Sequence, residues 1–268
     1  MRREYHQIHS DAVGRPLEVL SFGHAGKPML VFPCSAGRFF DWENFGMVET
    51  VAPFIEAGKL QVYCVDSLDR ESWYAGVHPA DKARRANDYD WAITHDIVPF
   101  IKKHSGRNGK IMTHGCSFGA YHAANFWLKH PDLFDLGLLL SGNYSIAFCV
   151  GDYRNDDIYY NDPLMYLPNL NDEHVLQKMR DNLLIIVSGQ GAWEDWLGEA
   201  REMAGHLAKR NVPHLLDIWG YDVNHDWPWW KRQIVYHLEK LDAAQWLTDT
   251  RTLDNTAVTG YLKRFARI

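Results

Sequence analysis

Short apolar runs alternate along the chain with stretches whose apolar residues recur every three or four positions. Each run ends at Gly, Pro or a polar cluster, as buried strands do. The runs predict strands at residues 17–23, 29–33, 61–67, 110–115, 136–142, 183–189 and 214–220. Only the turn-rich segment HAGKP separates the first two runs, which leaves no room for a crossover helix. We therefore expect these two strands to form an antiparallel edge of a sheet.

Helical spacing of apolar residues fills the intervals between the later strands. One stripe runs over residues 93–101, where Pro99 is expected to kink the helix. Further stripes begin at Ala120, Leu197 and Trp230. Strands and helices alternate over roughly 200 residues, which is typical of a mostly parallel sheet covered on both faces. The sequence thus predicts an α/β fold, a three-layer α/β/α sandwich with an antiparallel N-terminal edge.

The length and composition of the chain fit a single domain over residues 1–268. Its 268 residues, of which 46% are hydrophobic, are enough for a sizeable core. Residues 151–173 lack a clear strand or helix pattern, so we expect an irregular insertion there, of the kind that often serves as a lid. Residues 242–268 are mostly polar and are expected to form a C-terminal extension.

Charge and residue spacing exclude several kinds of partner. The formal net charge of −6 argues against nucleic acid, because binding a phosphate backbone needs a basic face. The four cysteines form no C-x-x-C pair and the histidines show no zinc-site spacing, so we expect no metal and no cofactor. The N-terminus has no apolar leader and no run could cross a membrane, which favours a cytoplasmic protein without a membrane partner. Homo-oligomerisation stays open.

The stretch HGCSFGA (114–120) contains the pattern G-x-S-x-G between a predicted strand and a predicted helix. In this setting the pattern indicates a nucleophile elbow with Ser117 at its apex. Gly115 and Gly119 are needed there because side chains would collide with the neighbouring strand and helix. The alternative is a glycine-rich strand end with Ser117 as a helix N-cap. The side chain of Cys116, one residue earlier, is expected to point into the packing of the sheet.

A nucleophilic serine needs a base, and the base needs an acid that orients it. In alpha/beta-hydrolases these residues follow in the order Ser, acid, His, each after a later strand. The segment QGAWEDW after the strand at 183–189 offers two carboxylates, Glu194 and Asp195. His225 follows the strand at 214–220, in the segment YDVNHDW. Three residues in this order, each after the expected strand, favour a catalytic triad over chance.

Four stretches resemble the Putative esterase (esterase D-like) family of the alpha/beta-hydrolase superfamily. That family also holds feruloyl and acetyl-xylan esterases, S-formylglutathione hydrolase and the mycolyltransferases. The pattern H-x-W-P-x-W around His225 is the most specific element of the resemblance, which covers about residues 15–240. It implies an alpha/beta-hydrolase fold. The stretches are VFPCSAGRFFDWENFGM (31–47), DSLDRESWY (66–74), HGCSFGAYHAANF (114–126) and WGYDVNHDWPWW (219–230).

The resemblance also implies a role for single residues of the proposed triad. Ser117 matches the nucleophile and His225 the general base. The acid of the family commonly lies about three residues after a glycine, and counting from Gly191 leads to Glu194. Asp195 is the alternative, because the loop here is longer than the usual pattern.

The oxyanion hole and the substrate side are implied in the same way. The resemblance assigns the two oxyanion donors to the backbone N–H groups of Phe118 and Ser35. Trp193, Trp227 and Trp229 flank the proposed acid and base, which would suit an aryl or sugar ring. The alternative for these side chains is that they pack the loops.

Three functions are consistent with these residues. The leading hypothesis is a serine hydrolase that cleaves a carboxylic ester of a small or sugar-linked acyl group through an acyl-serine intermediate. An acyltransferase would use the same triad, with an alcohol in place of water. A third hypothesis is a catalytically inactive hydrolase fold that serves as a binding protein.

Overall fold

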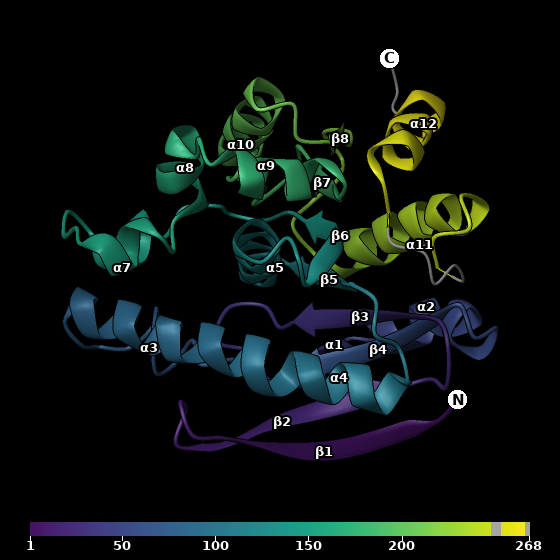
Figure 1. The fold of residues 1–268 in the computed structure, drawn as a ribbon, viewed down its shortest axis with the longest axis horizontal. Coiled ribbons are helices and arrows are strands. Elements are labelled where there is room, and N and C mark those ends of the chain that lie inside the picture. Colours follow the sequence, from purple (N-terminus) through teal and green to yellow (C-terminus); the bar gives the residue numbers. More distant parts are fainter. Residues whose placement is uncertain (248–252, 266–268) are drawn as a thin grey trace.

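The structure, a computed structural model, describes residues 1–247 and 253–265, and within these residues eight strands form a single sheet (Figure 1). The order of the strands across the sheet is β1-β2-β4-β3-β5-β6-β7-β8. From β4 to β8 all neighbours are parallel. The strands are β1 (Arg3–Ser10), β2 (Arg15–Phe22), β3 (Lys27–Phe32), β4 (Leu60–Val65), β5 (Ile111–Cys116), β6 (Phe134–Leu140), β7 (Leu183–Ser188) and β8 (His214–Ile218).

The N-terminal edge of the sheet is antiparallel, as predicted, but it is built from other strands. β2 pairs antiparallel with β1 on one side and with β4 on the other. The predicted pairing of residues 17–23 with 29–33 is wrong, because β3 lies inside the sheet between β4 and β5. The turn between β2 and β3 passes closely over the start of β4: Gly26 has φ +103°, and a Cβ there would meet the backbone of Lys59 at 2.2 Å. The close turn lets the chain pass from β2 to β3 across the position that β4 occupies between them.

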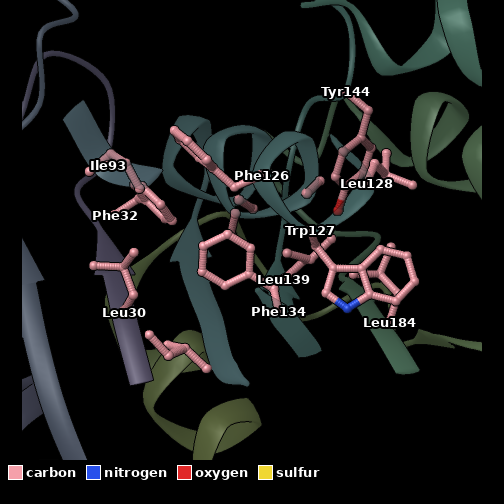
Figure 2. Packing of buried hydrophobic residues seen from close by; sticks show 14 of the residues in the cluster. Leu30, Phe32, Ile93, Phe126, Trp127, Leu128, Phe134, Leu139, Tyr144 and Leu184 are labelled. Carbon is pink, nitrogen blue, oxygen red and sulfur yellow. The ribbon is translucent and has the colours of Figure 1, made fainter. Parts of the chain in front are cut away.

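Helices cover both faces of the sheet and bury one hydrophobic cluster on each side (Figure 1). The first cluster lies under α3 (Pro79–Ala92), α4 (Val98–Ser105), α5 (Phe118–Lys129), α9 (Glu173–Arg180) and α10 (Leu197–Lys209). Phe126, Trp127 and Phe134 belong to its centre (Figure 2). The second cluster lies under α1 (Asp41–Asn44), α2 (Met47–Glu56), α11 (Trp227–Ala243) and α12 (Asn255–Phe265). The predicted three-layer sandwich is thus confirmed.

A π-helical turn, η1 (Ile93–Ile97), joins α3 to α4 at the place where Pro99 was expected to kink the helix. Proline has no N–H to donate to the preceding turn, and a wider turn is a common local response. The helical stripes predicted from Ala120, Leu197 and Trp230 correspond to α5, α10 and α11.

The segment 151–173, predicted to be irregular, instead contains short helices. These are α7 (Asp156–Tyr159), α8 (Pro163–Tyr166) and η2 (Leu167–Asn169), preceded by α6 (Ala147–Val150). Asp162 caps α8, and Ile158 and Leu167 are fully buried. Side-chain capping and burial of single apolar residues, rather than a periodic pattern, hold this segment in place.

The predicted extension 242–268 begins in the last turn of α11, and its described part packs onto the second cluster. Tyr261 of α12 stacks on Trp246 with ring centroids 4.5 Å apart. Val258 and Leu253 are also buried there. Residues 248–252 and 266–268 of the predicted extension lie outside the described residues.

Candidate active site

Ser117 occupies a sharp turn between β5 and α5, and its backbone has φ +55° and ψ −127°. This is a conformation that residues with a side chain rarely adopt, and it turns the serine out of the sheet. A Cβ on Gly115 would meet the backbone of Gly119 at 2.2 Å, and a Cβ on Gly119 would meet the carbonyl oxygen of Phe32 at 2.5 Å. The two glycines therefore let β5, α5 and the end of β3 approach closely enough to form the turn.

His225 brings its ring to Ser117 from the loop between β8 and α11. Its Nε2 lies 2.9 Å from Ser117 Oγ, within hydrogen-bond distance. The loop is held by the bond from the His225 amide to the carbonyl of Ala192, and Trp230 contacts the imidazole edge-on at 5.0 Å. The contact with Trp230 thus holds the imidazole in an orientation in which Nε2 faces Ser117 Oγ.

Glu194 lies on the other side of the imidazole, in the loop after β7. Its Oε2 is 3.7 Å from His225 Nδ1, and the side chain is almost completely buried. This distance is longer than a hydrogen bond, but catalytic contacts often tighten only when substrate is bound. Asp195, the alternative carboxylate, is exposed to solvent.

Ser141, which follows β6, holds the Glu194 carboxylate and was not found from the sequence. Its Oγ donates to Glu194 Oε1 at 2.6 Å and accepts from Trp230 Nε1 at 3.0 Å. The amide of Gly189 donates to the same Oε1 at 3.1 Å. The carboxylate is therefore held by residues that follow β6 and β7, and Trp230 of α11 fixes Ser141 in turn. The only sequence signal was that Ser141 lies at the carboxyl end of the strand predicted at 136–142.

The two predicted oxyanion donors belong to different segments of the chain. Phe118 is the first residue of α5, and Ser35 belongs to the loop after β3. Neither amide donates a hydrogen bond to any of the residues that the structure describes. Ala36, the next residue in the loop, has φ +52°.

Aromatic side chains gather around this site, only some of them predicted. Trp193 is 73% exposed, and Trp227 stacks on Phe45 with ring centroids 4.4 Å apart. Tyr74 and Phe148 were not predicted; both are exposed, and their rings lie 5.2 Å and 6.0 Å from that of Phe118. Trp229 carries the guanidinium of Arg232 over its ring. Exposed aromatics beside a nucleophile suit an apolar or aryl group of a ligand.

The two thiols near the site are poor nucleophiles. Cys116 is buried, and burial raises the pKa of its thiol well above the ordinary value. Burial likewise raises the pKa of Cys34, beside Ser35, to about 12. Because the thiolate is the reactive form, both side chains stay protonated and inert near neutral pH. Cys116 packs into the sheet, as expected from its position.

Glu4, His6 and His104 are the described residues that come close enough to hold a metal ion. They lie on β1 and α4, and His104 Nε2 already contacts Glu4 at 3.1 Å. His6 Nε2 is 2.8 Å from Ser21 Oγ, so these side chains have polar partners of their own. Within the described residues, no helix combines the length and apolar character needed to cross a bilayer.

Comparison with known proteins identifies relatives of this architecture. The sequence model of the family described as "Putative esterase" matches residues 42–241. No curated protein sequence matches the chain closely enough to count as a relative. Several solved structures share the fold, and the resemblance to esterase D-like enzymes noted from the sequence is confirmed.

Three of these structures illustrate the likeness. A ferulic acid esterase has a TM-score of 0.69 at 16% identity, over 88% of this chain and 95% of its own. An S-formylglutathione hydrolase from Agrobacterium tumefaciens has 0.68 at 12% identity, over 88% and 93%. The fluorophosphonate-binding serine hydrolase FphF of Staphylococcus aureus has 0.65 at 17% identity, over 89% and 97%. At such identities the likeness establishes a shared alpha/beta-hydrolase fold.

Proposed function

Because the chain belongs to the Putative esterase family, we propose that it is a serine hydrolase that cleaves a carboxylic ester through an acyl-serine intermediate. The observation that carries this proposal is the 2.9 Å approach of His225 Nε2 to Ser117 Oγ on a turn with φ +55°. A serine used only as a helix cap would bond to the amides of its own helix. Ser117 makes no such capping bond.

In the proposed reaction, Ser117 Oγ attacks the ester carbonyl carbon while His225 Nε2 takes the serine proton. The carbonyl oxygen becomes an oxyanion, which the amides of Phe118 and Ser35 stabilise. The intermediate collapses, His225 returns the proton to the leaving alcohol, and an acyl-serine remains. His225 then takes a proton from water as the water oxygen attacks the acyl carbon. This second intermediate collapses by breaking the bond to Ser117 Oγ, His225 returns the proton to that oxygen, and the acid is released. Glu194 keeps the imidazole oriented and stabilises its charged form.

The surroundings of Ser117 favour a substrate with an apolar or aryl portion. Tyr74 and Phe148 offer exposed rings next to the buried ring of Phe118, and Trp227 stacks on the exposed ring of Phe45. Trp193 is free to contact a sugar ring, since most of its surface is exposed. We therefore expect esters of a small aryl or sugar-linked acyl group to be turned over faster than long aliphatic esters.

A fluorophosphonate probe and a panel of esters test the proposal together. The probe should label the folded protein, and Ser117→Ala should abolish both labelling and ester turnover. The panel should contain p-nitrophenyl esters of increasing chain length together with acetylated and feruloylated sugars. Added alcohol acceptors distinguish hydrolysis from acyl transfer by their products. If the wild-type protein is neither labelled by the probe nor active on any ester, the proposal fails. The remaining hypothesis is then a catalytically inactive hydrolase fold that serves as a binding protein.

A further inference from the structure

The segment Ser67–Tyr74, here called the clamp segment, grips the loop that carries the proposed oxyanion donor Ser35. This oxyanion loop comprises residues 34–37. Four residues of the clamp segment bond to three successive residues of this loop, and Ala36 is bonded by two of them. The bonds are Tyr74 Oη to Ser35 Oγ at 2.9 Å, the Ala36 amide to Asp69 Oδ2 at 3.0 Å, Arg70 Nε to the Ala36 carbonyl at 3.1 Å, and Ser67 Oγ to the Gly37 carbonyl at 2.9 Å.

Asp69 is the residue that joins this loop to the helix of the nucleophile. Its side chain is fully buried, and its second oxygen, Oδ1, accepts a hydrogen bond from His122 Nε2 at 2.7 Å. His122 lies on α5, five residues after Ser117. One carboxylate thus bonds both the oxyanion loop and the helix whose first amide is that of Phe118. The distance between the two proposed oxyanion donors therefore depends on Asp69.

The loop needs such a hold because its backbone is strained. Ala36 has φ +52°, a conformation that is unfavourable for a residue with a side chain. The charge-assisted bond from the Ala36 amide to the buried Asp69 carboxylate is of the stronger kind of hydrogen bond and stabilises this conformation. Without that bond the loop would relax, and the Ser35 amide would turn away from the oxyanion.

We propose that Asp69 is a positioning residue that, with His122, holds the amides of Ser35 and Phe118 at the spacing that a tetrahedral oxyanion requires. The proposal rests on the serine-hydrolase function proposed above. The competing interpretation is that the Asp69–His122 pair only attaches α5 to the rest of the fold. The two differ in one measurable respect: a positioning role changes the binding of the tetrahedral adduct more than the binding of the substrate.

The test compares Asp69→Ala with Asp69→Asn on p-nitrophenyl acetate and on a trifluoromethyl ketone, which forms a tetrahedral adduct with serine. For Asp69→Ala, kcat should fall roughly 10²–10³-fold, as expected when one oxyanion donor is misplaced. KM should change little, and inhibitor affinity should fall in proportion to kcat/KM. Asp69→Asn should keep most of the activity, since its amide oxygen can accept from the Ala36 amide and its amide N–H can donate to His122 Nε2 in the tautomer that carries the proton on Nδ1.

Asp135→Asn is the matched control. Asp135 is also a buried carboxylate, but it pairs with Lys27 at the opposite ends of the strands from Ser117. This variant should lower the melting temperature and leave both kcat and inhibitor affinity as in the wild type. It shows what loss of a buried carboxylate pair does to stability alone.

Should Asp69→Ala not fold, Tyr74→Phe takes its place, because it removes one bond to the loop and leaves no buried group unpaired. It should show a smaller loss, of several-fold, with the same pattern in kcat and inhibitor affinity. A folded Asp69→Ala protein, or in its place Tyr74→Phe, with unchanged kcat and inhibitor affinity overturns the proposal. If the serine-hydrolase function proposed above is wrong, the wild-type protein itself will not turn over p-nitrophenyl acetate, which distinguishes that failure from failure of the Asp69 proposal.

Discussion

Replacing Glu194 by Gln removes the negative charge beside His225 while keeping the shape of the side chain. The amide oxygen of Gln can still accept from Ser141 Oγ and from the Gly189 amide, the two bonds that now reach Glu194 Oε1. The fold should therefore tolerate the change. What is lost is the carboxylate that faces Nδ1 and that, in the proposed mechanism, stabilises the imidazolium formed when His225 takes the serine proton.

The size of this effect follows from the distance between the two groups. Opposite unit charges 3.7 Å apart attract by about 4.5 kcal/mol at an effective dielectric constant of about 20. At about 1.36 kcal/mol per tenfold in rate, Glu194→Gln should lower kcat by roughly 2,000-fold. A loss of this size is in line with the loss of about 10⁴ that follows neutralisation of the acid in other serine triads.

The assay is steady-state hydrolysis of the best ester of the panel, together with a thermal melt of each protein. Asp195→Asn is the matched control, because Asp195 carries the same charge on the next residue but is exposed to solvent. It should keep kcat within about twofold of the wild type, as expected for an exposed charge. The reasoning is refuted if folded Glu194→Gln keeps kcat within about tenfold. A large loss in Asp195→Asn alone would assign the acid to Asp195.

Three further predictions concern the elbow and the core. Gly119→Ala should abolish turnover and destabilise the fold, since the added Cβ would lie 2.5 Å from the Phe32 carbonyl oxygen. The control is Gly205→Ala in α10, whose Cβ meets nothing within 4 Å and which should melt no lower than the wild type. Equal melting temperatures and equal turnover of the two variants would contradict this prediction. Cys116→Ala should keep most activity, because burial raises the pKa of that thiol and keeps it protonated; a loss as large as that of Ser117→Ala in the ester assay would contradict this. Burial lowers the pKa of His114 to about 4, below its unfolded value of about 6.5, so its contribution to stability is full above about pH 6.5 and is lost as pH falls toward 4. Urea unfolding between these pH values should therefore show a smaller loss of stability for His114→Gln than for the wild type, by up to about 3 kcal/mol; parallel curves would rule this out.

Much of the candidate site could be predicted because each of its three main residues follows a strand that is visible in the sequence as an apolar run. Ser117 comes at the end of one apolar run, and Glu194 and His225 lie in the loops that follow two others; parallel strands bring their carboxyl ends to one edge. The order of the strands was harder to predict. β1 alternates exposed and half-buried residues, which gives it no apolar run, and the position of β3 depends on β4, which lies far along the chain.

The supporting residues were missed for a related reason. Ser141 contacts Glu194 across 53 positions, and Asp69 contacts His122 across 53 as well. No local pattern signals such a contact, since any serine or aspartate after a strand would look the same. The short helices of the segment 151–173 were missed because four residues are too few to show a period, and capping side chains such as Asp162 begin them instead.

The backbone conformation of Ser117, which the proposed activity needs, lowers the stability of the folded protein. At φ +55° a serine costs of order 1–3 kcal/mol that a glycine in its place would not. Ser117→Gly is thus expected to raise the melting temperature and to end the proposed catalysis. Mutational drift, or a laboratory selection for stable folding alone, would favour losing this proposed nucleophile first. An active serine at this turn can therefore persist only where turnover itself is under selection.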